Sequence, residues 1–220
     1  MIERPSPNHN ERPAGTPIDI LLLHYTGMQT AQAAIDRLCD PAAEVSAHYT
    51  IDEDGSIYRH VPETRRAWHA GRSHWAGETD INGRSIGIEL VNPGHEFGYR
   101  PFPEAQLSAL IPLAGDIVAR HEIPAARVLG HSDVAPGRKQ DPGELFDWAR
   151  LAAAGIGLWP GDAEPCSKDD ARSSLARFGY DITADGVVVA FQRHFRPSRV
   201  DGVLDDETLA CLGAVVAKKP

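Results

Sequence analysis

The sequence predicts an α/β fold, with a central mixed β-sheet flanked by helices and a small C-terminal three-helix domain. Residues 18–26 (IDILLLHYT) form a continuous apolar run, which is typical of a strand buried on both faces. Residues 103–121 carry apolar side chains at helical spacing. After residue 165, three further segments carry apolar side chains at helical spacing. We therefore expect an N-terminal arm over residues 1–17, a main domain over 18–160 and a helical domain over 165–220.

The first half of the main domain is expected to contain four strands, the first over residues 18–26, and one short helix. The arm is polar and rich in proline, so we expect it to be disordered or loosely draped. A short helix is expected over residues 31–38. Residues 48–61 (HYTIDEDGSIYRHV) have two β-rich halves around an Asp-Gly pair, which predicts a hairpin because glycine supplies the positive φ of a tight turn. Residues 85–91 (SIGIELV) predict another strand, which ends at Asn-Pro-Gly.

The second half of the main domain should begin with its longest helix. This helix is expected over residues 103–121, where Pro112 should kink it or remove a hydrogen bond. Residues 127–131 (RVLGH) predict a short strand that enters a loop rich in glycine and proline, and residues 147–154 predict a last helix. A domain boundary is expected in the Pro/Gly-containing stretch 158–166.

Composition excludes several classes of protein. The 220 residues carry a formal net charge of −9, and there is no run of Lys and Arg, which argues against a nucleic-acid binder. There is no apolar stretch of 20 residues, so integral membrane association is not expected. The first residues form no apolar signal segment, which predicts a cytoplasmic protein if the chain start is native. The periplasm or cell envelope is the alternative if a signal segment has been removed.

Two histidines and an aspartate follow or end predicted strands. His24 ends the first apolar run, His131 ends the 127–131 strand, and Asp141 lies in the loop that follows. Two imidazoles and one carboxylate are a ligand set that a hydrolytic zinc ion accepts, and three protein ligands leave one position for water. Spacing alone does not select these histidines from the ten in the chain, and a single histidine at a strand end is more often structural.

Two charged residues are candidates for the chemistry beside such a metal. Glu89 lies in the apolar 85–91 strand, where burial would raise its pKa and suit it to general acid–base work. The alternative is a structural ion pair or an outward-facing side chain. Lys139 precedes Asp141 by two residues, so both side chains can face one site, where an ammonium would stabilise an oxyanion. The alternative is a solvated surface lysine.

Five motifs together carry a resemblance to a known family. They are LLLHYTG, SAHYTID, WHAG, RSIGIELVNPG and GHSDVAPGRKQDPG. Over residues 15–160 the chain resembles the zinc-dependent N-acetylmuramoyl-L-alanine amidases of the type-2 amidase family. The segment 165–220 is similar to the three-helix peptidoglycan-binding module that follows the catalytic domain in some members.

The resemblance implies an enzyme that uses one zinc ion per chain, held by His24, His131 and Asp141. It implies that Glu89 is the catalytic acid/base and that Lys139 stabilises the oxyanion. The expected reaction is hydrolysis of the amide between N-acetylmuramic acid and L-alanine of muropeptides in bacterial cell-wall turnover, and a need for the 1,6-anhydro sugar is left open. Expected substrate contacts are Tyr49, His69, Trp68, Asn92, Arg72 and Arg138. Two alternatives remain: a muropeptide-binding module without catalysis, and a zinc peptidase that cuts within stem peptides.

Overall fold

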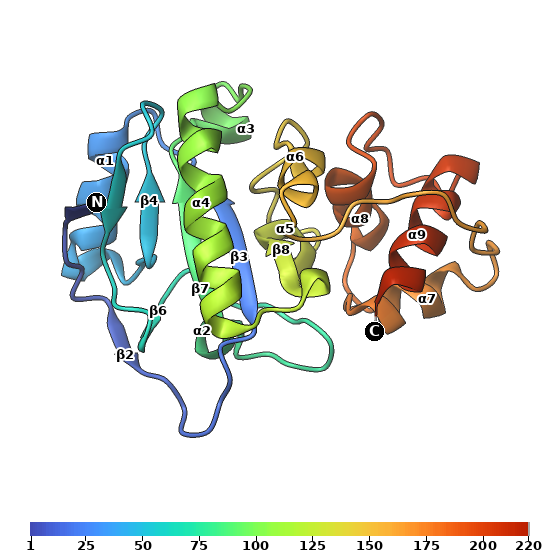
Figure 1. Cartoon of the computed structure of the whole chain (residues 1–220), viewed down its shortest axis with the longest axis horizontal. Coiled ribbons are helices and arrows are strands. Elements are labelled where there is room, and N and C mark those ends of the chain that lie inside the picture. The colour runs from blue at the N-terminus through green and yellow to red at the C-terminus, as the bar shows by residue number, and fades with distance from the viewer. Residues whose placement is uncertain (220) are drawn as a thin grey trace.

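A six-stranded mixed sheet forms the centre of the protein, and a group of helices lies at one side of it (Figure 1). The computed structural model describes residues 1–219. Within the sheet, β4 pairs with β7, β7 with β3, and β3 with β8, and all three pairs are parallel. Strand β5 is antiparallel to β4. The predicted α/β class with a mixed sheet is therefore confirmed. In sheet order the strands are β1 (Ile2–Glu3), β5 (Ile57–Arg59), β4 (Tyr49–Ile51), β7 (Ser85–Leu90), β3 (Ile20–Tyr25) and β8 (Val128–Gly130).

The helices of the main domain cover the sheet and its loops. The long helix α4 lies across one face of the sheet and continues through Pro112 (Figure 1). Helix α1 begins where the Thr30 hydroxyl accepts a hydrogen bond from the Ala33 amide, and it is capped by Asp40 before Pro41, close to the predicted end at residue 38. The helices of this part are α1 (Ala31–Cys39), α2 (Ile81–Arg84), α3 (Gly94–Phe97), α4 (Glu104–His121), α5 (His131–Val134) and α6 (Trp148–Ala153).

Strand β3 divides its apolar side chains between two hydrophobic clusters. Leu21 and Leu23 pack in the cluster under α4, whereas Ile20 and Leu22 belong to the cluster that contains the C-terminal helices. All four are fully buried. Because alternate residues of a strand point to opposite faces, the continuous apolar run that predicted this strand results from its burial on both sides.

The C-terminal region contains the three predicted short helices: α7 (Ala171–Phe178), α8 (Val187–Phe195) and α9 (Asp206–Lys218). It packs closely on the main domain. The Trp75 ring lies 4.9 Å from the Tyr180 ring and would clash with any Cβ at Gly179. The buried carboxylate of Asp133 accepts hydrogen bonds from the Tyr180 hydroxyl, at 2.6 Å, and from His194 Nδ1, at 2.7 Å. The two regions therefore share one core, and the boundary at 158–166 remains a prediction.

The N-terminal arm is ordered, so the expectation of a disordered or loosely draped segment is wrong. Strand β1 adds to the edge of the main sheet, and β2 (His9–Glu11) pairs with β6 (Arg65–Ala67) in a separate two-stranded sheet. The side chain of Asn8 is buried and donates hydrogen bonds to the Asp40 and Val45 carbonyl oxygens. Polar side chains that bond to backbone atoms hold the arm without the apolar pattern that would have predicted it.

The described part of the chain contains no membrane-spanning helix. None of the helices between residues 1 and 219 combines the length and the apolar character needed to cross a bilayer. The cysteines Cys39, Cys166 and Cys211 are free, partly exposed thiols.

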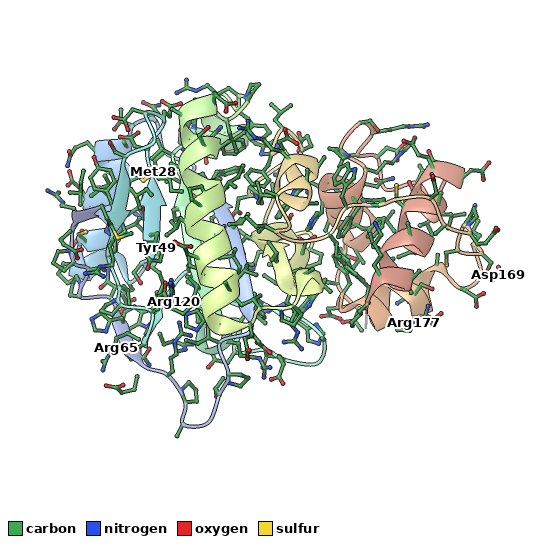
Figure 2. All side chains as sticks on the ribbon, in the orientation of Figure 1. Met28, Tyr49, Arg65, Arg120, Asp169 and Arg177 are labelled. Carbon is green, nitrogen blue, oxygen red and sulfur yellow. The ribbon has the colours of Figure 1, made fainter. Side chains whose placement is uncertain are left out.

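Glu63 fastens the C-terminal end of α4 to the sheet. Its carboxylate accepts hydrogen bonds from the Tyr49 hydroxyl at 2.7 Å, Arg120 at 2.8 Å and His121 at 2.6 Å. Tyr49 and Arg120 are both labelled in Figure 2. Burial raises the pKa of Glu63, but these hydrogen bonds outweigh it and lower the pKa to about 2. The ionised carboxylate therefore stabilises the fold.

Replacing Glu63 with glutamine should lower the free energy of unfolding at pH 7 by about 1–3 kcal/mol, towards the lower end because Arg120 is half exposed. The folded-state pKa lies below the ordinary value of 4.5, so the stabilisation is present above pH 4.5 and is lost as the pH falls towards 2. Urea unfolding of Glu63→Gln and the parent across this range measures it. Glu3→Gln, which removes an exposed pair with Arg59, is the control and should change little. A Glu63→Gln deficit that did not shrink in acid would contradict the assignment.

Candidate metal centre and its cleft

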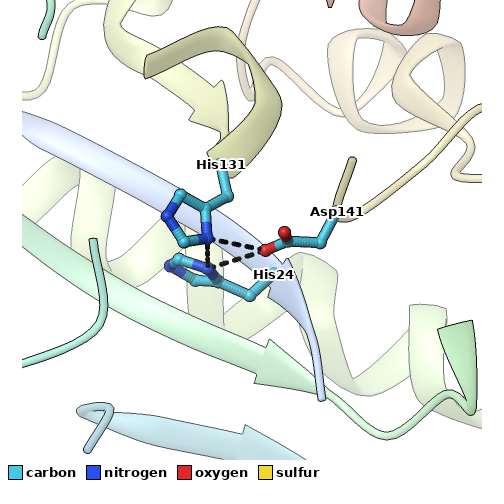
Figure 3. Close-up of side chains that lie close together, drawn as sticks. All are labelled: His24, His131 and Asp141. Carbon is cyan, nitrogen blue, oxygen red and sulfur yellow. Dashed lines mark hydrogen bonds and ion pairs between the residues drawn. The ribbon is translucent and has the colours of Figure 1, made fainter. Parts of the chain in front are cut away.

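Three buried side chains meet at the carboxyl edge of the parallel strands (Figure 3). His24 lies in β3, His131 follows directly after β8, and Asp141 lies in the loop after α5. The two Nδ1 atoms are 3.0 Å apart, and Asp141 Oδ2 is 2.9 Å from each of them. The structure thus brings together the three residues that the sequence predicted as ligands.

The chemistry of these donors fits a divalent metal ion. On the far side of each ring, His24 Nε2 faces His69 Nδ1 at 3.0 Å, and His131 Nε2 donates to the Ala70 carbonyl oxygen at 2.9 Å. Both Nδ1 atoms therefore face Asp141. Burial and the neighbouring His131 lower the pKa of His24 to about 4. Burial raises the pKa of Asp141, but His131 and His24 outweigh it and hold that pKa below its ordinary range. Two imidazoles beside a carboxylate are a suitable zinc ligand set.

Glu89 and Lys139 line the same cleft as the three donors, and this cleft has a volume of about 570 Å³. Glu89 is opposite His24 in the parallel pairing of β3 and β7. Its Oε2 atom is buried without a hydrogen-bond partner, and burial together with Asp141 raises its pKa well above the ordinary value. A carboxyl group with a raised pKa in a cleft is suited to accept and return a proton.

Three of the predicted substrate contacts line this cleft. They are Trp68, His69 and Arg138. The Trp68 indole nitrogen donates to Asn10 at 2.9 Å, so the N-terminal arm orients this ring. The Arg138 guanidinium donates to the carbonyl oxygens of Ala70, at 2.7 Å, and Arg72, at 2.6 Å. Arg138 therefore holds the loop on one side of the cleft as well as placing positive charge there.

The other three predicted contacts lie elsewhere. Tyr49 packs in the cluster under α4 and bonds to Glu63, because its position in β4 turns it away from the cleft. Asn92 is fully buried, where it donates to the Arg100 carbonyl oxygen and accepts from the Gly94 amide, so it shapes the loop after β7. Arg72 lines a separate pocket. The structure therefore places Tyr49 and Asn92 away from the cleft, whereas substrate contact by Arg72 stays a prediction.

Sequence reasoning missed two side chains on the walls of the cleft, Arg37 and His95. Arg37 lies on α1 and His95 on α3. His95 is held by the Tyr25 hydroxyl at 2.9 Å and by Glu144 at 3.1 Å. His95 could have been suspected only from its place after the predicted 85–91 strand, since loops at that edge of a parallel sheet face the site.

Comparison with known proteins agrees with this geometry. The family model described as N-acetylmuramoyl-L-alanine amidase matches residues 14–144. The amidase AmiD of Escherichia coli is 40% identical over 233 residues, which cover 91% of this chain and 83% of the relative. The 1,6-anhydro-N-acetylmuramyl-L-alanine amidase AmpD of Enterobacter cloacae is 35% identical over 166 residues, which cover 68% of this chain and 87% of the relative.

Solved structures extend the similarity to nearly the whole chain. The structure of E. coli AmiD with the substrate anhydro-N-acetylmuramic acid-L-Ala-D-gamma-Glu-L-Lys has a TM-score of 0.82 and 38% identity, and covers 95% of this chain and 93% of that one. AmpDh3 of Pseudomonas aeruginosa has a TM-score of 0.85 and 36% identity, with 94% of each chain covered. The fold, the grouped donors and the family match lead to one conclusion: this chain belongs to the N-acetylmuramoyl-L-alanine amidase family.

Proposed function

We propose that this protein is a zinc amidase that cleaves the amide bond between N-acetylmuramic acid and the L-alanine of peptidoglycan stem peptides. One observation carries the proposal beyond the family match. Three buried ligand atoms, from His24, His131 and Asp141, line one cleft together with Glu89, whose Oε2 atom is buried without a hydrogen-bond partner. Ligand atoms next to a proton-transfer group are what hydrolysis of an unactivated amide requires.

The proposed zinc ligands are His24 Nδ1, His131 Nδ1 and Asp141 Oδ2. A zinc ion held there supplies Lewis acidity, which polarises a substrate carbonyl and makes water easier to deprotonate. The cleft residues do the remaining work. Glu89 accepts the proton of the attacking water and delivers it to the departing L-alanine amine. The Lys139 ammonium lies in the same cleft and stabilises the negative charge that develops on the carbonyl oxygen.

We propose muropeptides with the 1,6-anhydro sugar as substrates in cell-wall recycling. Support comes from the AmiD structure with a substrate of this kind and from the name of the AmpD relative. The cleft also suits an anionic stem peptide, because Arg37, Arg138 and Lys139 surround it with positive charge. For the C-terminal helices we retain the prediction that they bind the wall polymer.

The zinc-loaded protein should release an intact stem peptide, beginning with L-alanine, and a free lactyl sugar from a 1,6-anhydro muropeptide. Mass spectrometry of the products measures this, and a parallel incubation with the non-anhydro muropeptide measures the preference for the sugar form. A peptide shortened internally would show a peptidase instead. Binding of the muropeptide without release of any product would show a recognition module.

Glu89→Gln should lower kcat by a factor of about 10²–10⁴ while the protein keeps its zinc, because glutamine preserves the shape of the side chain but does not accept the proton. Turnover of the muropeptide and metal content are measured on the same sample. The matched control is Glu96→Gln, since Glu96 is an exposed carboxylate on the wall of the same cleft. A near-parental rate in Glu89→Gln would remove Glu89 from the proton transfer.

Asp141→Asn should weaken zinc binding and abolish the rise in melting temperature that zinc gives the parent protein, because the amide supplies no negative charge to the metal. Chelator competition and thermal unfolding with and without zinc measure the two effects. His95→Ala removes a histidine of the same cleft that lies outside the group of ligand atoms, and it should keep the zinc. Equal zinc affinity in Asp141→Asn and the parent would exclude this site.

A further inference from the structure

A chain of three hydrogen bonds leads away from His24 into the protein. His24 Nε2 lies 3.0 Å from His69 Nδ1, and His69 Nε2 lies 3.2 Å from the Ser85 hydroxyl. The same hydroxyl is 2.6 Å from the carbonyl oxygen of Ile81. The side chains of His24, His69 and Ser85 are all buried. The proposed reaction gives His69 and Ser85 no role.

The direction of every hydrogen bond in this chain follows from its last member. The Ile81 carbonyl oxygen only accepts, so the single hydroxyl proton of Ser85 points to it, and Ser85 must accept from His69 Nε2. His69 has no carboxylate partner and is buried, which disfavours a cationic ring. In the neutral ring Nδ1 then carries no hydrogen and accepts from His24 Nε2. The proton of His24 is thereby held on Nε2, and its Nδ1 lone pair is left for a metal.

The next residue does the same for the second histidine ligand. The Ala70 carbonyl oxygen accepts from His131 Nε2, so the Nδ1 lone pair of His131 is free as well. The backbone amides of His69 and Ala70 both donate to Asn82 Oδ1, at 3.0 and 2.8 Å. A single amide side chain thus fixes the segment that serves both ligands.

Strand β7 leaves room for this arrangement. A Cβ atom at Gly87 would lie 2.6 Å from His69 Nδ1, so only glycine allows the ring to approach β3 through this position. Ser85 is two residues earlier in the strand and points to the same face. The sequence of β7 therefore provides both the space for the His69 ring and the acceptor for its N–H group.

We infer that His69, Ser85 and Asn82 are positioning residues, which hold both histidine ligands as the tautomer that presents Nδ1 to the metal. This inference rests on the zinc site proposed above. It assigns His69 to the support of His24 and not to the substrate. Partners of this kind are generally worth 10–100-fold in metal affinity.

The test compares two substitutions of His69. His69→Leu removes the acceptor for His24 and should weaken zinc binding about 10–100-fold. His69→Asn places an amide oxygen near the position of Nδ1, and it should recover most of this loss. Chelator competition measures the affinity for zinc. Nitrogen-15 NMR of the zinc-free proteins reports the tautomers, and the Nε2–H form of His24 should dominate in the parent and in His69→Asn but not in His69→Leu.

A second variant and a control keep the result interpretable. Ser85→Ala is a smaller change that removes the acceptor for His69 Nε2, and it should also weaken zinc binding if His69→Leu does not fold. His60→Leu removes a histidine that is also buried but bonds to Arg4 and Thr50, so zinc affinity should stay within a factor of about two.

The outcomes separate this inference from the proposed function. Zinc affinity in His69→Leu and Ser85→Ala equal to the parent, with folded proteins by circular dichroism, would overturn the positioning role and leave the zinc site intact. Equal losses in His69→Leu and His69→Asn would also overturn it, since a hydrogen-bond acceptor would then be irrelevant. A parent protein that binds no zinc would refute the proposed function itself.

Discussion

The parallel pairing of β3 with β7 on one side and β8 on the other is the constraint on which the site depends. Parallel strands end at the same edge, so this pairing brings His24, Glu89 and the start of α5 together although they are far apart in the chain. The pairing is itself enforced by burial. Leu21 and Leu23 pack under α4, and Ile20 and Leu22 pack towards the C-terminal helices, so a shift of β3 by one residue would turn His24 to the wrong face.

The same strand explains why the C-terminal helices are more than an appendage. Their cluster includes Ile20, Leu22 and Trp75 of the main domain, and Asp133, which bonds to Tyr180 and His194, lies two residues after His131. Removal of residues 165–220 would therefore expose apolar surface of β3 and β8 and leave the Asp133 carboxylate without two partners. If wall binding were lost after such a truncation, the loss could come from the missing helices or from damage to the metal site. Substitutions on the outer surface of α7 or α9 test the helices alone.

Much of this arrangement could be predicted because it follows from apolar periodicity and from the common edge of parallel strands. The long helix, the hairpin, the buried strands and the meeting of His24, His131 and Asp141 are of this kind. The arm was mispredicted because β1 and β2 have only two and three residues, and because the Asn8 side chain between them holds the arm by bonds to backbone atoms, which leave no apolar pattern. Tyr49 was misassigned because in a strand of three residues the face is decided by tertiary packing, and sequence gives no register there. The support of His24 by His69 was beyond prediction, since His69 lies outside every predicted strand and helix and no pattern places its ring beside β3.

Two arrangements of unsatisfied polar groups lie on or beside the well-packed strands β3 and β7. Glu89 Oε2 is buried without a partner, which costs about 1–3 kcal/mol, and three ligand atoms with lone pairs face one another a few residues away. Neither feature stabilises the fold, and replacement of Glu89 by an apolar residue of similar size would relieve the first. Such local violations persist only where the surrounding structure overdetermines the geometry, and here strands β3 and β7 do so, since all but one residue of each is buried. The cost is then explained by chemistry: a carboxyl group poised to exchange a proton, beside ligands that only a cation satisfies, is useful to a hydrolase and to no purely structural element.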